Sequence, residues 1–317
     1  MQKYVLRRLA LMIPTLVGLS IVVFTMVRIV PGDVVALIAG EFGAVSPETK
    51  QAILEDFGLA DNIAVQYLNW SRDMLSGDLG TSIISGRSVV SELSDRLPVT
   101  FELGILAIII ASAVAVPIGV VSAIRQNTTA DYVGRSLAIG FLAAPNFWIA
   151  ILLITFASKW FIWGVPSTTY PSLFSDPVSN LKFMAVPASL LGLGLSGSVM
   201  RYTRSAVLEV MRQDYVRTAH AKGLAERTVV TRHVLKNALI PVITVIGLQL
   251  PVVIGGTVII ESVYSIPGMG RYYISSINQL DFPVIQAINL VVATFTVFSI
   301  LAVDLLYSVL NPRIRYS

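Results

Sequence analysis

The chain has 317 residues, of which 55% are hydrophobic and only 13% are charged, and its mean hydropathy is +0.75. Soluble domains carry about 25% charged residues, so this composition excludes an ordinary soluble protein as well as disordered, coiled-coil and collagen-like chains. We therefore expect a polytopic membrane protein. The net charge of +4 does not indicate nucleic acid, because Lys and Arg usually mark the cytoplasmic side of membrane proteins. The absence of cysteine excludes disulfides, thiol catalysis and Cys-based metal sites.

Six uncharged runs of 18 to 24 residues follow one another along the chain. Each has the roughly 17–25 residues that a helix needs to cross the hydrocarbon core, where only a helix satisfies the backbone of such a run. The runs are residues 9–27, 103–124, 136–158, 183–200, 237–260 and 282–303. The first is too long for a typical signal-peptide core and no A-x-A-like site follows it, so we interpret it as a span.

The basic residues predict the orientation of these spans. With the N-terminus inside, the cytoplasmic segments carry 15 Lys and Arg residues and the short outer loops carry three. Both termini are therefore predicted to be cytoplasmic. We expect three parts: residues 1–30 as the N-terminus and first span, 31–98 as an external helical segment, and 99–317 as a core of five helices.

The first outer segment, residues 28–102, is too long for a simple connection. Residues 47–56 are expected to form a short helix with Pro at its first position. Residues 65–75 form a second, amphipathic stretch, and residues 77–80 form a turn. The segment holds five basic and eleven acidic residues. It either meets an external partner or covers a pore mouth, or it packs with no binding role.

The cytoplasmic segment 201–236 holds eight basic residues and both histidines, His220 and His233. Its residues up to Lys222 suit a short helix, and Gly223 suits the left-handed position that ends one. A second helix, roughly 226–237, is expected to continue into the fifth span. The small side chains of Ala219 and Ala221 would let the first helix lie deep in a groove on another protein.

The charge of this helix also favours docking on another protein, because Arg217 and Lys222 would suit an acidic groove. The alternative is an ordinary amphipathic hairpin on the membrane surface. The two histidines are 13 residues apart in a basic segment with no cluster of carboxylates nearby, so we expect neither a metal site nor an acid–base pair there.

This segment resembles the cytoplasmic coupling loop of ABC-importer permeases, whose pattern is E-A-A, three residues, Gly, and then a hydrophobic residue and Pro. Arg217-Thr218-Ala219, Gly223 and Leu239-Ile240-Pro241 match it, with Arg217 and Thr218 in place of the Glu and the first Ala. The form of residues 215–223 is similar to the peptide/opine/nickel branch of the family. Stretches elsewhere are similar too: residues 4–33, 77–82, 97–100, 261–271 and 281–284. The resemblance covers essentially the whole chain and is to the B-type permease of dipeptide and oligopeptide importers.

The resemblance implies an all-α membrane protein with six transmembrane helices and a small helical external segment, located in a bacterial or archaeal inner membrane. It implies three kinds of protein partner, namely a second homologous permease, two cytoplasmic ATPase subunits and an external substrate-binding protein. It also implies contact with membrane lipid. The residues implied to couple to the ATPase are Tyr215, Arg217, Thr218, Ala219, Ala221, Lys222 and Gly223. The chain has no G-x-x-x-x-G-K-[ST] loop, so we expect no cofactor in it, no enzymatic activity, and ATP with Mg²⁺ in the partner subunits.

Polar groups at membrane depth are candidates for the pathway, because they cost free energy unless they face protein or water. Asn146, Gln249 and Asn289 are expected either to line the pathway or to form interhelical hydrogen bonds. Bends that permit gating are expected in the fifth span, where the residues concerned are Pro241, Pro251, Gly255 and Gly256.

The cargo stays open at this point. Peptides come first, while nickel chelates, opines, glutathione and oligosaccharides are carried by similar permeases. A self-contained secondary transporter or channel is the alternative of another class, and it would require internal repeats or charged residues deep in the spans.

Overall fold

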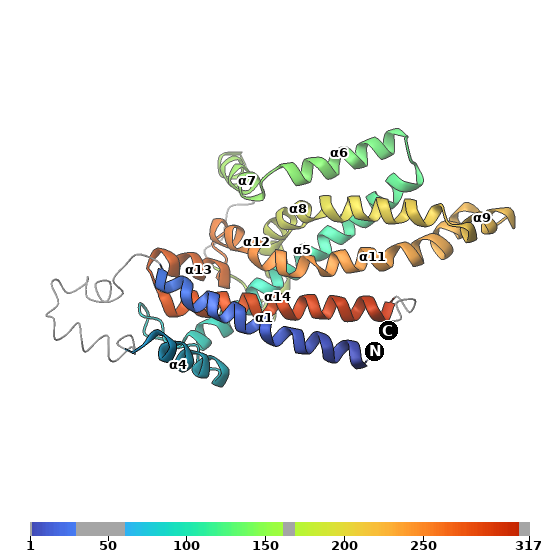
Figure 1. The fold of residues 1–317 in the computed structure, drawn as a ribbon. Helices are drawn as coiled ribbons and strands as arrows, with labels where there is room; N and C mark the ends of the chain where they lie inside the picture. Colours follow the sequence, from blue (N-terminus) through green and yellow to red (C-terminus); the bar gives the residue numbers. More distant parts are fainter. Residues whose placement is uncertain (1, 30–60, 161–168, 311–317) are drawn as a thin grey trace. The chain divides into compact units, whose positions relative to one another are not determined.

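The computed structural model describes residues 2–29, 61–160 and 169–310, and nearly all of their regular structure is helical. In chain order (Figure 1) the elements are α1 Gln2–Ile29, α4 Ile63–Ser76, α5 Val89–Ile124, α6 Thr129–Ala143, α7 Asn146–Trp160, α8 Pro177–Met211, α9 Asp214–Ala221, α10 Glu226–Thr228, the π-helical turn η1 Val229–Val234, α11 Leu235–Gly247, α12 Gln249–Val263, α13 Met269–Asn278 and α14 Phe282–Leu310. The predicted all-α class is confirmed. The helix predicted at residues 47–56 lies outside the described residues.

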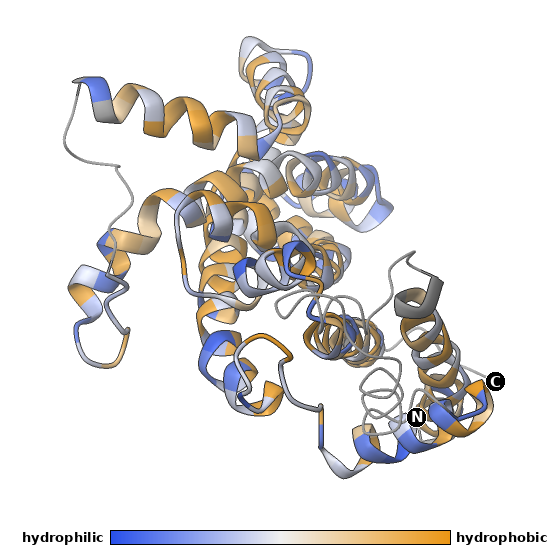
Figure 2. Cartoon of the chain, turned by 90° about the vertical axis from the view of Figure 1, so that its left-hand side faces the viewer, coloured by the Kyte–Doolittle hydropathy of each residue, from blue (hydrophilic) through white to orange (hydrophobic). Residues whose placement is uncertain are grey.

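Within the residues that the structure describes, five helical segments are long and apolar enough to cross a membrane, and α6 with α7 makes a sixth if that bent pair is one span. The five are Val5–Met26, Val89–Ile124, Pro177–Met211, Glu226–Gly247 and Phe282–Val309. Hydrophobic colours run along the long helices in Figure 2. These segments confirm a polytopic membrane protein with five to six spans.

The predicted third span, residues 136–158, is wrong as a single helix. It is divided into α6 and α7, which are bent by 88°. The break falls at Ala144 and Pro145. Pro145 has no backbone N–H, and its ring disfavours helical geometry at the residue before it; Ala144 accordingly has φ −87° and ψ 120°. Asn146 therefore begins a new helix.

The predicted fifth span, residues 237–260, is wrong as a single helix for a similar reason. α11 ends at Gly247 and α12 begins at Gln249, with Leu248 between them at ψ −10°. Pro251 explains the break, because it cannot donate a hydrogen bond to the Gly247 carbonyl four residues earlier and its ring displaces that carbonyl.

The described residues form two compact units, which we describe separately. The first contains residues within Val99–Arg271 and Phe298–Ser317, and the second contains residues within Gln2–Pro98 and Tyr272–Val297. The predicted three-part division along the chain stays a prediction. A buried cluster of the first unit joins α5, α7, α8 and α12, and its members are Val99, Leu103, Ala107, Ala150, Met184, Ala188, Leu190, Leu191, Ile260, Tyr264 and Ile266.

Glycines of α8 allow other helices to approach its backbone closely. A Cβ on Gly192 would lie 2.7 Å from the carbonyl oxygen of Ala107 and 2.9 Å from the Cβ of Ile110, both on α5. A Cβ on Gly197 would lie 2.6 Å from the carbonyl oxygen of Ala138 on α6. These glycines therefore serve helix packing, as small residues commonly do where membrane helices meet.

Gly192→Ala is expected to destabilise the fold by about 1–3 kcal/mol, because the added methyl group overfills the contact with α5. Gly140→Ala on α6 is the matched control, since nothing lies within 4 Å of its new Cβ. The free energy of unfolding of that variant is expected to lie within about 0.5 kcal/mol of the wild-type value, or above it because alanine is the better helix former. Thermal unfolding in detergent compares them, and equal unfolding midpoints would contradict the close approach.

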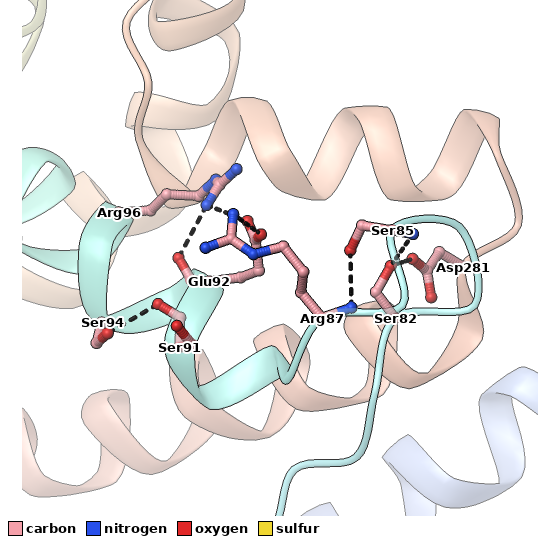
Figure 3. A network of polar contacts seen from close by, with 8 residues as sticks. All are labelled: Ser82, Ser85, Arg87, Ser91, Glu92, Ser94, Arg96 and Asp281. Atoms are coloured by element: carbon pink, nitrogen blue, oxygen red, sulfur yellow. Dashed lines mark hydrogen bonds and ion pairs between the residues drawn. The ribbon is translucent and has the colours of Figure 1, made fainter.

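In the second unit, a network of polar contacts fixes the turn before α5 (Figure 3). The buried carboxylate of Asp281 accepts a hydrogen bond of 2.5 Å from the hydroxyl of Ser82. Glu92 is 3% exposed and forms ion pairs with Arg87, at 2.8 Å, and with Arg96 one helical turn later. The network thereby ties the first turns of α5 to the preceding chain and the chain before α5 to the start of α14.

α4 contains the predicted amphipathic stretch of residues 65–75, which is confirmed as helical. Its first turn is capped by the side chain of Asn62, which accepts a hydrogen bond of 3.0 Å from the N–H of Ala64. Its last turn ends at Gly77, whose φ of 85° requires a residue without Cβ. Gly80 has a φ of 83° as well, so the predicted turn at residues 77–80 is also confirmed.

Candidate functional site

α9 is a short helix whose end is defined by Gly223. This residue has a φ of 74°. Its N–H donates to the carbonyl of His220 at 2.9 Å, and the N–H of Leu224 donates to the carbonyl of Ala219 at 3.4 Å. These two bonds form a Schellman motif, in which the left-handed residue satisfies the last helical carbonyls. The predicted short helix and its left-handed glycine are confirmed.

The inner face of α9 packs within the first unit. Val216 and Ala219 lie three residues apart on one face and are 1% and 5% exposed. They join a buried cluster whose other members are Ala123, Val207, Val229, Val234 and Ala238. Ala219 therefore faces the interior of the hairpin that α9 forms with α10 and η1, residues 214–234. This differs from the expectation that both alanines face another protein. Ala221 is exposed.

Two polar contacts hold α9 to the helical segment that follows it. A ring nitrogen of His220 lies 2.8 Å from a carboxylate oxygen of Glu226. The side-chain amide of Asn237 donates to the hydroxyl of Tyr215 at 2.9 Å. Figure 1 shows α9 at the far end of the pair α8 and α11. Because α9 is fixed at both ends, the hairpin forms a compact projection at the end of these two long helices.

The outer face of the hairpin is basic and partly apolar. Within residues 214–227, four of its exposed residues are basic or histidine, namely Arg217, His220, Lys222 and Arg227, and two are acidic, Asp214 and Glu226. The other exposed residues of this range are Tyr215, Thr218, Ala221, Gly223, Leu224 and Ala225. The guanidinium of Arg217 lies 3.5 Å from the exposed carboxylate of Asp214, a contact that solvent weakens. Arg217 and Lys222 therefore present cations next to Leu224, and this surface complements a groove with acidic and apolar groups.

Two of the three predicted pathway residues contact one face of α8. The side-chain amide of Gln249 donates to the hydroxyl of Ser198 at 2.8 Å. The amide of Asn146 lies against Gly194, where any Cβ would collide with it. Gly194 and Ser198 are one turn apart and share a face. Asn146 and Gln249 are each the first residue of a helix after a break, which is where transporters often bind polar solutes.

The third pathway residue, Asn289, lies in the second unit. It accepts a hydrogen bond of 3.1 Å from the hydroxyl of Tyr273 and donates one of 2.9 Å to the carbonyl of Ile285. Among the predicted gating residues, Pro251 causes the break at Leu248 described above.

Another gating residue, Pro241, lies inside α11, and the last two, Gly255 and Gly256, lie inside α12, where the helix is continuous. A Cβ at either position would meet nothing within 4 Å. The glycines are therefore not required by packing, and their role in gating stays a prediction.

A buried ion pair between α6 and α8 was missed by the sequence reasoning. The carboxylate of Asp131 is fully buried and accepts two hydrogen bonds from the guanidinium of Arg204, at 2.7 and 2.8 Å. It also accepts hydrogen bonds from the hydroxyl of Ser122 at 2.5 Å and the N–H of Asn127 at 3.0 Å. Arg204 lies one turn before Val207 of the hairpin cluster, so the pair anchors α6 beside the base of the hairpin.

A second buried carboxylate, Glu261, fixes the loop after α12. It accepts hydrogen bonds from the hydroxyl of Thr100 at 2.8 Å and the N–H of Arg271 at 3.0 Å. Gly268 and Gly270 pass so close that a Cβ on either would collide with this carboxylate. The sequence contains one indication of this contact, because Glu261 is the first residue of the stretch 261–271 that supports the family resemblance.

Comparison with protein families decides the kind of protein. Residues 115–316 match the family described as binding-protein-dependent transport system inner membrane component, and residues 1–104 match the N-terminal part of such membrane components. The chain belongs to this family. It is thus an importer permease of the inner membrane, as the resemblance implied, and the hairpin lies within the larger matched region. This membership favours a subunit of a multi-component importer over a self-contained transporter.

Individual relatives of this permease are similar over its full length. The dipeptide transport system permease protein DppB of Escherichia coli K12 is 37% identical over 338 residues, covering 100% of this chain and 99% of the relative. The oligopeptide transport system permease protein AppB of Bacillus subtilis is 38% identical over 320 residues, covering 100% of both. A crystal structure of an amino acid ABC transporter with histidines covers 71% of this chain and 94% of its own, with a TM-score of 0.52 and 15% identity. That likeness supports the fold alone.

Proposed function

We propose that this permease forms half of the pathway through which an importer moves dipeptides or oligopeptides across the inner membrane. The observation that supports peptides as the cargo is the full-length similarity to permeases named for dipeptide and oligopeptide transport. A second homologous permease supplies the other half of the pathway, and an external binding protein delivers the peptide.

The hairpin couples the permease to ATP hydrolysis. Its exposed basic surface docks on a cytoplasmic ATPase subunit, with Arg217 and Lys222 next to acidic groups and Leu224 in an apolar part of the groove. ATP and Mg²⁺ bind to the two ATPase subunits and not to this chain. The orientation that this requires is supported by the 15 basic residues on the predicted cytoplasmic side.

The cargo is tested by uptake in cells that lack only this permease and regain it from a plasmid. Labelled dipeptides and tetrapeptides are expected to accumulate only in cells with the plasmid, and unlabelled peptide is expected to compete. Restored uptake of nickel chelates, glutathione or oligosaccharides without uptake of peptides would contradict the proposed cargo and leave the importer class intact.

The pathway role of Gln249 predicts unequal effects for the two partners of its hydrogen bond. Interhelical hydrogen bonds in membranes contribute only about 0.6–2 kcal/mol, so Ser198→Ala is expected to leave uptake near the wild-type level. Gln249→Leu removes a polar group at the break before α12 and is expected to lower peptide uptake several-fold. Equal uptake by the two variants in vesicles would indicate that Gln249 serves packing alone.

A further inference from the structure

α4 lies beside α1 (Figure 1), and it contacts residues within the apolar span of that helix. The hydroxyls of Ser20 and Tyr67 are 2.8 Å apart. The ring of Phe24 lies 5.3 Å from that of Tyr67 and 5.6 Å from that of Trp70, measured between centroids. Ser20 precedes the end of the span at Met26 by six residues, which corresponds to about 9 Å along a helix. α4 is therefore beside the end of a membrane span, and not above it in water.

The remaining surface of α4 is divided into an apolar and a polar side. Tyr67 and Trp70 contact α1 and are part-buried, as are Gln66, Ser71 and Met74 of the same helix. Leu68 and Leu75, which share a face at a spacing of seven residues, are 64% and 90% exposed. Arg72 is also exposed and borders these leucines on the side toward Asn69, where a long side chain can rest its apolar stem on lipid and place its charge in water.

The neighbouring face of α4 is polar and also exposed, and its residues are Asn69, Asp73 and Ser76. A helix with one side on protein, one apolar and one polar fits the boundary between lipid and water.

Two further features identify lipid as the occupant of the apolar side. At the same level, α1 itself exposes the apolar side chains of Val17, Ile21 and Val22, which are expected to meet lipid because they belong to a membrane span. Tyr67 and Trp70 belong to the residue types that gather at the membrane interface.

We propose that α4 is an interfacial helix in the outer leaflet, with Leu68 and Leu75 in contact with lipid and Asn69 and Asp73 facing water. The leaflet is the one at the C-terminal end of α1, which is the outer one in the proposed orientation. The helix anchors the external segment to the membrane and sets its height above the bilayer.

Single-cysteine variants test this directly, because the chain contains no cysteine of its own. Leu68→Cys and Leu75→Cys report the apolar side, and Asn69→Cys and Asp73→Cys are the matched controls on the polar side. Each variant is assembled with its partner subunits, reconstituted in vesicles of phosphatidylethanolamine and phosphatidylglycerol, and spin-labelled; the wild-type complex corrects for labelling of the partners.

The ratio of collision with oxygen, which partitions into lipid, to collision with a water-soluble nickel complex is expected to be several-fold higher at 68 and 75 than at 69 and 73. A water-like ratio at all four positions would overturn the proposal, since α4 would then lie above the membrane. Labels at 68 and 75 that neither reagent reaches would overturn it as well, because the apolar side would then be covered by a protein partner.

Discussion

Gly223→Val is expected to lower peptide uptake about tenfold and to remove stimulation of the ATPase by substrate. The reason is the φ of 74° at this position, which a β-branched side chain does not adopt without strain. Left-handed geometry costs an L-residue roughly 1–2 kcal/mol, and 1.4 kcal/mol corresponds to about a tenfold shift in the equilibrium constant between the native hairpin and its alternatives. Uptake and ATPase activity of the reconstituted complex measure the effect.

Gly223→Asn separates backbone geometry from side-chain bulk. Asparagine tolerates the left-handed conformation, and nothing lies within 4 Å of a Cβ at this position. We therefore expect the asparagine variant to stay close to wild-type uptake. Loss of uptake in both variants would show that bulk at the docking surface matters, and normal coupling in the valine variant would contradict a role for the hairpin shape.

Arg204→Met is expected to destabilise the permease by about 3–5 kcal/mol, because it leaves the carboxylate of Asp131 buried without its cation. Asp131 is fully buried, whereas the side chain of Arg204 is 21% exposed. The penalty of losing the partner is therefore larger when the arginine is removed than when the carboxylate is neutralised. Thermal unfolding in detergent and the yield of assembled complex are the measurements.

The double variant Asp131→Asn/Arg204→Met is the control for this pair. It removes both charges, so it is expected to be more stable than Arg204→Met alone, as a double-mutant cycle would reveal. A double variant whose loss equals the sum of the two single losses would contradict a direct ion pair.

The local features of this permease follow from the sequence where one residue type decides the backbone. Gly223 ends α9 because only a residue without Cβ adopts a left-handed conformation freely, and Gly77 ends α4 for the same reason. The apolar runs predict most of the spans because their length alone fits the bilayer. Pro145 was the exception, because the structure breaks the third predicted span there, although many transmembrane helices contain proline without a break. In the fifth span, where a bend was expected at Pro251, the structure has a break at Leu248.

Long-range contacts could not be predicted from one sequence. Asp131 and Arg204 are 73 residues apart, and Arg204 is one of eight basic residues in its segment. The pathway candidates illustrate the same limit, because the contacts of Asn146 and Gln249 depend on Gly194 and Ser198 of another helix. Ala219 was assigned to the outer face because its burial depends on distant residues such as Ala123.

Cross-linking from the tip of the hairpin tests the coupling role most directly. A Leu224→Cys variant carries a photoreactive benzophenone maleimide at the exposed end of the hairpin. After illumination of inside-out membranes, we expect an adduct with the ATPase subunit that is lost when the ATPase is absent. Labelling of this cysteine by an impermeant reagent from outside the cell, with no ATPase adduct, would contradict it.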